Sequence, residues 1–122
     1  MNTKLIQYRE AICGEKILIK DDNPRSKSYI TLLNKSHSNY WKVKIDGDVY
    51  KKGSPETRCD VYVEHANLHH EYFIELKGKH HVDEGYTQLI TSIDEFSEVV
   101  NKKKKNNNTK LRAFIVPIEI PS

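Results

Sequence analysis

This chain has few cysteines and no long apolar run. These two features argue against a disulfide scaffold, a local cysteine metal site and a membrane span. Its 122 residues include two cysteines, Cys13 and Cys59, which are too few for a disulfide scaffold and too far apart for a local metal knuckle. No apolar run approaches the length of a membrane span, and residues 1–10 are charged and lack an apolar segment. We therefore expect no signal peptide, no membrane partner, and a cytoplasmic protein with reduced thiols.

Length and composition limit the size of the core. A chain of this length is expected to form one domain, spanning residues 1–122. Apolar residues make up 37% and charged residues 30% of the chain, so the core must be small. The net charge of +3 and the isoelectric point near 8.8 are compatible with a polyanionic partner.

Short apolar segments alternate with turns along most of the chain. Residues 3–16 are weakly helical in pattern, and Asp46-Gly47 indicates a turn after a segment in which apolar and polar residues alternate. Runs rich in Val, Ile, Tyr and Phe predict strands. We expect these strands at residues 17–19, 29–33, 41–45, 58–63, 72–78 and 111–118.

From residue 82 onward the spacing of apolar residues changes to three and four, which predicts a helix of about five turns over 82–100. A strand, a helix and a further strand in succession imply a right-handed crossover and a parallel pair. The expected fold class is α/β with a mixed sheet: a helix, a three-stranded antiparallel meander, a helix and one further strand. The apolar stripe of the 82–100 helix consists of Val82, Tyr86, Leu89, Ile93, Phe96 and Val100.

Charged residues interrupt two of the predicted strands, and packing alone does not explain them. Asp60 lies in the first strand, and Glu75-Leu76-Lys77 follows fifteen residues later in the second. Side chains alternate between the faces of a strand, so Glu75 and Lys77 point the same way. The intervening residues are few enough for a hairpin, which makes the strands neighbours about 5 Å apart. We therefore expect two carboxylates and one ammonium group to converge.

Such a group suits the hydrolysis of a phosphodiester bond, because carboxylates hold Mg²⁺ and a lysine stabilises the developing charge or the attacking hydroxide. A purely structural alternative stays open. Asp60, Glu75 and Lys77 would then form a salt-bridge cluster on a solvated sheet face, where alternating Glu and Lys are ordinary.

The arrangement of Asp60, Glu75-x-Lys77, a following amphipathic helix and a further strand resembles the PD-(D/E)XK nuclease superfamily, which has the restriction-endonuclease-like fold. The resemblance covers roughly residues 41–118, and Cys59 stands where the family name has proline. It implies that Asp60, Glu75 and the backbone carbonyl of Leu76 bind Mg²⁺, with Mn²⁺ able to substitute. It also implies that Lys77 positions or polarises the attacking water and that the substrate is DNA.

Four further residues are candidates for this site. Gln88 lies on the predicted 82–100 helix, where some members of the superfamily carry a glutamine. Glu10 or Glu15 would supply the acidic residue that many members carry on the first helix, and Glu10 is preferred because it lies within the helical pattern. Asp46 would be a further metal contact if it is more than a turn residue.

Other functions remain open from the sequence. A non-catalytic module that binds nucleic acid or a protein could retain the same fold, and the same scaffold could cleave RNA. Cleavage of both strands of DNA would call for a homodimer or a larger complex. The histidines near the second motif strand, including His65 and His69, are better explained as turn residues than as zinc ligands.

Overall fold

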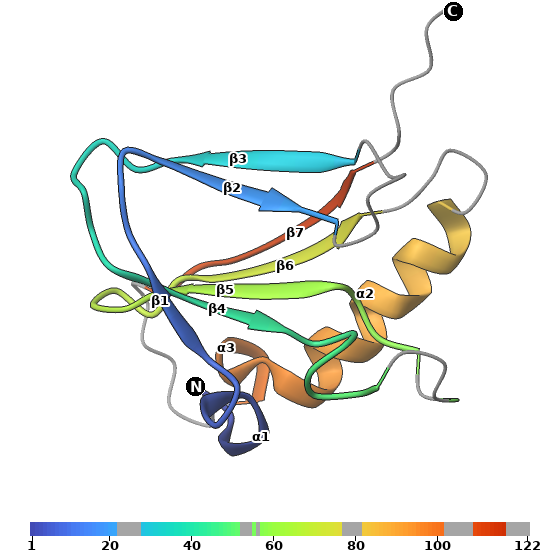
Figure 1. Ribbon diagram of the computed structural model, residues 1–122. Helices are drawn as coiled ribbons and strands as arrows, with labels where there is room; N and C mark the ends of the chain where they lie inside the picture. The colour runs from blue at the N-terminus through green and yellow to red at the C-terminus, as the bar shows by residue number, and fades with distance from the viewer. Residues whose placement is uncertain (22–27, 52–54, 56, 77–81, 102–108, 117–122) are drawn as a thin grey trace, which may run out of the picture.

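The computed structural model describes residues 1–21, 28–51, 55, 57–76, 82–101 and 109–116. Within these ranges the chain forms short helices and strands in an α/β arrangement (Figure 1). Along the chain they are α1 (Thr3–Ile6), β1 (Glu10–Ile12), β2 (Lys16–Lys20), β3 (Tyr29–Leu33), β4 (Tyr40–Lys44), β5 (Val61–His65), β6 (Glu71–Leu76), α2 (Val82–Phe96), α3 (Glu98–Asn101) and β7 (Leu111–Val116).

Five of the strands form a mixed sheet in the order β1-β4-β5-β6-β7. The β4, β5 and β6 strands are an antiparallel meander, and β7 pairs with β6 in parallel after the α2 crossover. The predicted meander and parallel pair are therefore confirmed. The turn predicted between the two motif strands is also present, because β5 ends at His65 and β6 begins at Glu71.

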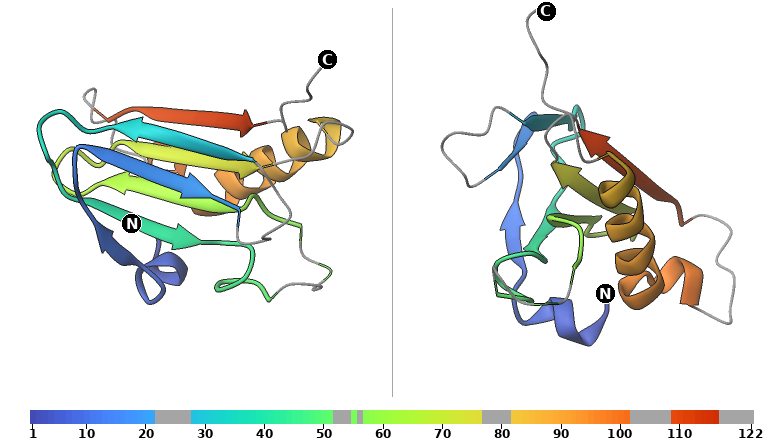
Figure 2. Two further views of the ribbon diagram at one scale, coloured as in Figure 1. Left: turned by 45° about the horizontal axis from the view of Figure 1, so that its top comes forward. Right: turned by 90° about the vertical axis from the view of Figure 1, so that its right-hand side faces the viewer.

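Both faces of the main sheet are covered. The β2 and β3 strands pair with each other in a separate two-stranded sheet, and this hairpin and α2 lie on opposite sides of the main sheet (Figure 2). Double coverage explains why every residue of β5 is buried. On the hairpin side the buried core consists of Ile17, Ile19, Val61, Val63, Ile74 and Leu76. On the helix side it consists of Leu5, Val43, Ile45, Cys59, Tyr62, Phe73, Leu89 and Phe96.

The predicted helix over residues 3–16 is wrong beyond its first turn. Only Thr3–Ile6 is helical, capped by the Asn2 side chain, which accepts a hydrogen bond from the Lys4 N–H. The chain then joins the edge of the main sheet as β1 and turns into the hairpin at Gly14, whose φ of 124° suits glycine. Pairing with β4 satisfies more backbone groups than an isolated short helix would.

The predicted helix over residues 82–100 is confirmed in its position, but its end and its packing face differ. It stops at Phe96, and a separate turn of helix, α3, follows. Three residues of the predicted stripe are exposed rather than packed: Val82, Tyr86 and Val100. The buried face of α2 consists instead of Gly85, Leu89, Ser92 and Phe96.

Candidate functional site

Asp60 lies immediately before β5 and is tied to the end of β6. Its Oδ2 accepts a hydrogen bond of 2.7 Å from the backbone N–H of Leu76. Continuing the β5–β6 register one residue beyond the Val61–Ile74 pair brings Asp60 opposite Glu75. The predicted convergence of these two motif segments is therefore present in the structure, and Asp60 is held by a bond that leaves its other carboxylate oxygen for further contacts.

Glu75 lies on the helix side of the sheet and is 1% exposed. It shares that side with Phe73, because side chains two residues apart on a strand point the same way. The interpretation of a cluster on a solvated sheet face is therefore wrong for Glu75. A carboxylate this deeply buried needs a cation or hydrogen-bond donors to offset the loss of hydration.

Cys59 lies among these acidic groups. Burial raises the pKa of the Cys59 thiol to about 12, and the negative charges of Glu75 and Asp60 contribute to the rise, against the opposing effect of a hydrogen bond with Ser92. Both carboxylates therefore lie near one thiol. That thiol therefore stays protonated at neutral pH.

Two side chains of α2 hold the segment that carries Asp60. The Ser92 hydroxyl accepts a 2.8 Å hydrogen bond from the Cys59 N–H and donates one of 2.7 Å to the Gln88 carbonyl. One turn further along, Glu95 accepts a 2.7 Å charge-assisted bond from Arg58 Nε. Sequence reasoning missed these positioning roles. The available signal was the polar pair of Ser92 and Glu95 at a three-residue spacing beside Leu89 and Phe96.

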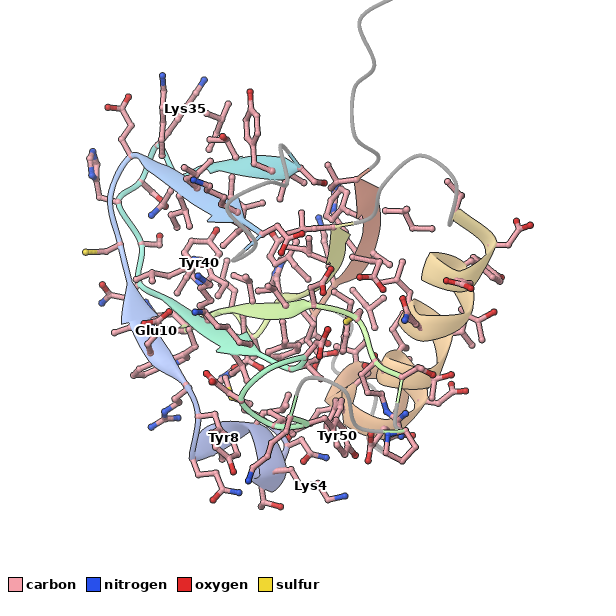
Figure 3. The ribbon with its side chains drawn as sticks, turned by 45° about the vertical axis from the view of Figure 1, so that its right-hand side comes forward. Lys4, Tyr8, Glu10, Lys35, Tyr40 and Tyr50 are labelled. Carbon is pink, nitrogen blue, oxygen red and sulfur yellow. The ribbon has the colours of Figure 1, made fainter. Side chains whose placement is uncertain are left out.

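Glu95 also gathers contacts from the N-terminal part of the chain. Tyr50 donates its hydroxyl proton to the Glu95 carboxylate, and Lys4 Nζ lies 3.3 Å from Glu95 Oε2. Burial alone would raise the pKa of Glu95, but the hydrogen bonds and charges of Tyr50, Arg58 and Lys4 outweigh it and lower that pKa. Figure 3 shows Lys4 and Tyr50 at the same end of the molecule as α1.

Gln88 lies on the sheet-facing part of α2, next to Leu89, and is half-buried. Its Oε1 is inaccessible to solvent and accepts no hydrogen bond from the part of the chain that the structure describes. A buried amide oxygen in this state is uncommon. Gln88 is therefore not a fully exposed surface residue, and its buried Oε1 has no hydrogen-bond donor among the described residues.

Lys77 lies outside the described residues, as do Lys79 and the histidines at 80 and 81. The predicted position of the Lys77 ammonium beside Glu75 therefore stays a prediction. Leu76, the last residue of β6, is described and pairs in parallel with Val116 of β7.

Glu10 and Glu15 do not occupy the places predicted for them. Glu10 is in β1 opposite Lys42, and its carboxylate lies 3.7 Å from Lys42 Nζ. Glu15 lies in the turn between β1 and β2 and is exposed. Neither is on a helix, because the segment forms strands instead. Figure 3 shows Glu10 on β1, at the far edge of the sheet from β7.

Asp46 lies in the turn after β4, as predicted, and its backbone N–H donates a 3.3 Å hydrogen bond to the Asp60 carbonyl. It does not form a three-carboxylate group with Asp60 and Glu75. Among the described residues there is no group of three or more His, Cys, Asp or Glu side chains that could hold a metal ion.

The remaining donors nevertheless suit a hard cation. Mg²⁺ commonly binds through one or two carboxylates and keeps several waters, so it does not require a cage of protein side chains. Asp60 and Glu75 offer two carboxylates, and the Leu76 carbonyl is a further oxygen. All three candidate ligands are oxygen atoms, which Mg²⁺ and Mn²⁺ prefer.

A second buried acidic group lies on the same side of the sheet. Glu64 and Glu71 are directly paired across β5 and β6, and both are buried. Tyr62 Oη hydrogen-bonds to both carboxylates, and burial with the Glu71 charge raises the Tyr62 pKa. Glu71 also accepts hydrogen bonds from the Ser97 hydroxyl at 2.6 Å and from the first backbone N–H groups of α3. Tyr62 has one hydroxyl proton for the two carboxylates, whereas the bonds from Ser97 and α3 tie Glu71 to the end of α2 and the start of α3.

Among the helices of the described ranges, none has the length and apolar character that crossing a membrane requires.

Comparisons with known proteins do not assign the chain to a family. No family model, curated protein or solved structure matches this chain.

Proposed function

We propose that this protein is a Mg²⁺-dependent nuclease that hydrolyses phosphodiester bonds in DNA, with a core like that of the PD-(D/E)XK superfamily. The observation that carries the proposal is the 2.7 Å hydrogen bond from the Leu76 N–H to Asp60. It joins the two halves of the motif at the ends of neighbouring strands. The β4-β5-β6 meander, the α2 crossover and the parallel β7 strand agree with the core that the resemblance implies.

In this proposal the chain supplies the ligands and fixes their positions. Asp60 and Glu75 would bind the cation through carboxylate oxygens, and the Leu76 carbonyl would be a third ligand. When bound, Mg²⁺ would lower the pKa of a water molecule and polarise a phosphate oxygen. Lys77 would place a positive charge beside the phosphate and orient the attacking water.

The surroundings of the site support this chemistry in two ways. Burial of Glu75 excludes bulk water from one side of the site, which strengthens its attraction to a cation. The bonds from α2 to Cys59 and Arg58 limit the movement of Asp60. A reacting group held by the fold in this way loses less entropy when substrate binds.

A cleavage assay on isosteric variants tests the proposal. Supercoiled, linear and single-stranded DNA, and RNA of the same sequence, are incubated with Mg²⁺, with Mn²⁺ and with EDTA. Asp60→Asn, Glu75→Gln and Lys77→Met should each lower the Mg²⁺-dependent rate by about a hundredfold or more, because each removes a charge that acts on the reacting phosphate. The matched control is Glu10→Gln, which removes the same charge from β1 and should cleave like the parent.

Three results would contradict the proposal: parental rates in all three variants, cleavage that persists in EDTA, or no cleavage of any substrate. Preference for RNA over DNA would keep the chemistry and change the substrate. A mixture of nicked and linear products from supercoiled DNA would show whether one or both strands are cut. Sedimentation of the same sample would test the homodimer that cutting of both strands calls for.

Gln88 is proposed to contact the substrate or its water rather than the metal. Gln88→Ala should lower the cleavage rate while changing the unfolding free energy by less than about 1 kcal/mol, because the lost Oε1 has no described partner. An unchanged cleavage rate would remove Gln88 from the site.

A further inference from the structure

A groove lies on the side of the sheet opposite Glu75, between the hairpin and the β7 edge. Its volume is about 400 Å³, within the range of pockets that hold small ligands. One wall is β3, from Ile30 to Leu33, and Tyr72 of β6 and Phe114 of β7 contribute its aromatic surface. Tyr40 also lines it, and Figure 3 shows this residue in the region between the hairpin and the main sheet.

The strands on either side of the groove are joined where β7 ends. There the Ser28 hydroxyl, just before β3, donates a 2.9 Å hydrogen bond to the Val116 carbonyl. Figure 1 shows β3 and β7 converging at this end and separating toward the start of β7.

Basic side chains gather at the end of the groove where β7 begins. His70 lies directly before β6 and Lys110 directly before β7, and the two parallel strands begin side by side, with the Glu71 N–H bonded to the Lys110 carbonyl. Arg112 is the partner of Tyr72 in the register. Burial lowers the pKa of His70, and the positive charges of His65, Lys110, Arg112 and His69 lower it further. No acidic residue is among the described residues that line the groove.

Two aromatic residues beside these cations, Tyr72 and Phe114, form a stacked pair. The Tyr72 and Phe114 rings are nearly parallel, with an interplanar angle of 13° and centroids 6.5 Å apart. Both side chains are only partly buried, so they keep surface for a ligand. Cations next to exposed aromatic rings fit a ligand that combines a flat ring with an anionic group.

We propose that this groove binds an unpaired nucleotide of single-stranded nucleic acid, with its base on the Tyr72 and Phe114 rings and its phosphate at Lys110 and Arg112. Stacking on aromatic residues with phosphates on basic ones is the usual way that proteins bind single strands. A paired base is excluded because its faces are already stacked within the duplex. Lys35, exposed beyond the end of β3 (Figure 3), gives a neighbouring phosphate a further cation.

An added peptide strand fits the groove less well. A strand between β3 and β7 would need about 4.8 Å on each side along its whole length. The Ser28–Val116 hydrogen bond joins the two walls directly at one end and leaves no such space. The cations at the end of the groove where β7 begins would also gain nothing from an uncharged backbone.

This site is separate from the proposed cleavage site, and its binding requires no metal. The main sheet lies between them, because Tyr72 and Phe114 pack with the hairpin-side core while Glu75 faces α2. The binding experiment is therefore done in EDTA. Failure of cleavage then leaves this proposal intact, and failure of binding leaves the cleavage assay unaffected.

The test measures fluorescence anisotropy with a fluorescein-labelled thymidine oligonucleotide of about 15 nucleotides, a length that spans one binding site. Lys110→Glu with Arg112→Glu should weaken binding at least tenfold. The matched control is Lys16→Glu with Lys20→Glu on the outer face of the hairpin. It changes the net charge equally and should weaken binding less than about threefold.

A second pair of variants tests the stacked rings of Tyr72 and Phe114 without changing the net charge. Tyr72→Leu and Phe114→Leu should each weaken binding about fivefold or more, because each removes a stacking surface. Tyr29→Leu is the control, since Tyr29 is 59% exposed on the outer face of the hairpin. Unfolding of each variant is followed by circular dichroism. For any variant that does not fold, photocrosslinking of a bromodeoxyuridine oligonucleotide to the parent protein decides, with the crosslink expected at Tyr72 or Phe114.

Several outcomes would overturn the proposal. They are equal losses in the groove and control variants, a crosslink mapped outside the groove, or equal affinity for the fully paired duplex. Equal competition by free thymidine monophosphate would show that the ligand is a nucleotide rather than a strand. Absence of binding to any probe would show that the groove binds neither a nucleotide nor a strand. Loss of binding confined to the groove variants would establish the site.

Discussion

The two faces of the main sheet differ sharply in what they bury. The hairpin side is an apolar core built from aliphatic residues of β2, β5 and β6. The helix side also has an apolar core, but it contains three buried glutamates, at 64, 71 and 75. Buried carboxylates contribute little to stability compared with apolar residues of similar size. Their presence on one face alone therefore indicates other roles for that face.

Those roles differ between Glu71 and Glu75. Glu71 is fully engaged within the protein, since it accepts bonds from Tyr62, Ser97 and the first turn of α3. Its role is to fix where α2 ends and α3 begins. Glu75 lies instead beside Asp60, at the edge where the motif segments meet. Both faces of the sheet thus bury apolar residues, and the helix side also holds buried polar groups in fixed positions.

The largest expected effect would come from cavities, and it should be the same on both faces. Leu89→Ala on the helix side and Ile74→Ala on the hairpin side should each lower the unfolding free energy by about 2–5 kcal/mol, because each leaves a buried cavity. Urea unfolding measures both values. Val100→Ala is the control on the exposed side of the predicted stripe and should change stability by less than about 0.5 kcal/mol. A loss at Val100 equal to that at Leu89 would restore the stripe predicted from the sequence.

The second-largest loss of stability should differ between the helix side of the sheet, with its buried glutamates, and the apolar hairpin side. Glu71→Met should lower the unfolding free energy by about 2–4 kcal/mol, because the donors of Ser97 and α3 lose their buried acceptor. Leu76→Met, the matched change on the apolar face, should lower it by less than about 1.5 kcal/mol. Urea unfolding of both variants measures the two losses. Equal losses would mean that the helix side also tolerates an apolar core, as some buried ionic groups do.

A smaller effect should link α2 to the candidate site. Ser92→Ala leaves the Cys59 N–H without its acceptor and should lower stability by about 1–3 kcal/mol. It should also lower the Mg²⁺-dependent cleavage rate of the remaining folded protein, because Asp60 adjoins Cys59. Thr91→Ala is the control, since Thr91 makes the same bond to a carbonyl one turn back without contacting residues 58–60. Similar cleavage rates in both variants would show that Ser92 acts on stability alone.

The smallest effect concerns pH. The folded state lowers the Glu95 pKa below its ordinary value of 4.5, so this carboxylate stabilises the fold above that value and loses its contribution as the pH falls through the lowered pKa. Glu95→Gln should therefore lower stability at pH 7 by about 1 kcal/mol or less, since partly exposed ion pairs contribute little. Thermal melts of parent and variant should converge as the pH falls below 4.5 and through the lowered pKa of Glu95. A difference independent of pH would mean that the charge of Glu95 is not involved.

The parts of the fold that the sequence predicted are those with strong local patterns. Alternation in β4 and the apolar motif strands β5 and β6 was readable because a half-buried or fully buried strand shows it directly. The N-terminal segment was not, since its few apolar residues fit a weak helix as well as a strand. Its pairing with the free edge of β4, through Glu10 and Lys42, is a tertiary contact that no local pattern shows.

The buried face of α2 differs from the predicted apolar stripe for a related reason. Counting apolar residues favours Tyr86 and Val100, but the helix packs closely through the small residues Gly85 and Ser92. Ser92 is buried because its hydroxyl satisfies the Cys59 N–H and a helix carbonyl. Polar residues that become buried through specific hydrogen bonds are invisible to a hydrophobic pattern.

By itself the sequence determined the meander, the crossover to a parallel strand, and the pairing of Asp60 with the Glu75 segment. These follow from period-two strands, a short turn and the handedness of the crossover. Only the tertiary structure decided that Glu75 is buried beneath α2, that Glu10 lies on a sheet edge, and that cations and aromatic rings meet between β3 and β7. Each of these depends on which elements pack together across long stretches of chain, and burial and proximity of that kind are set by packing rather than by local order.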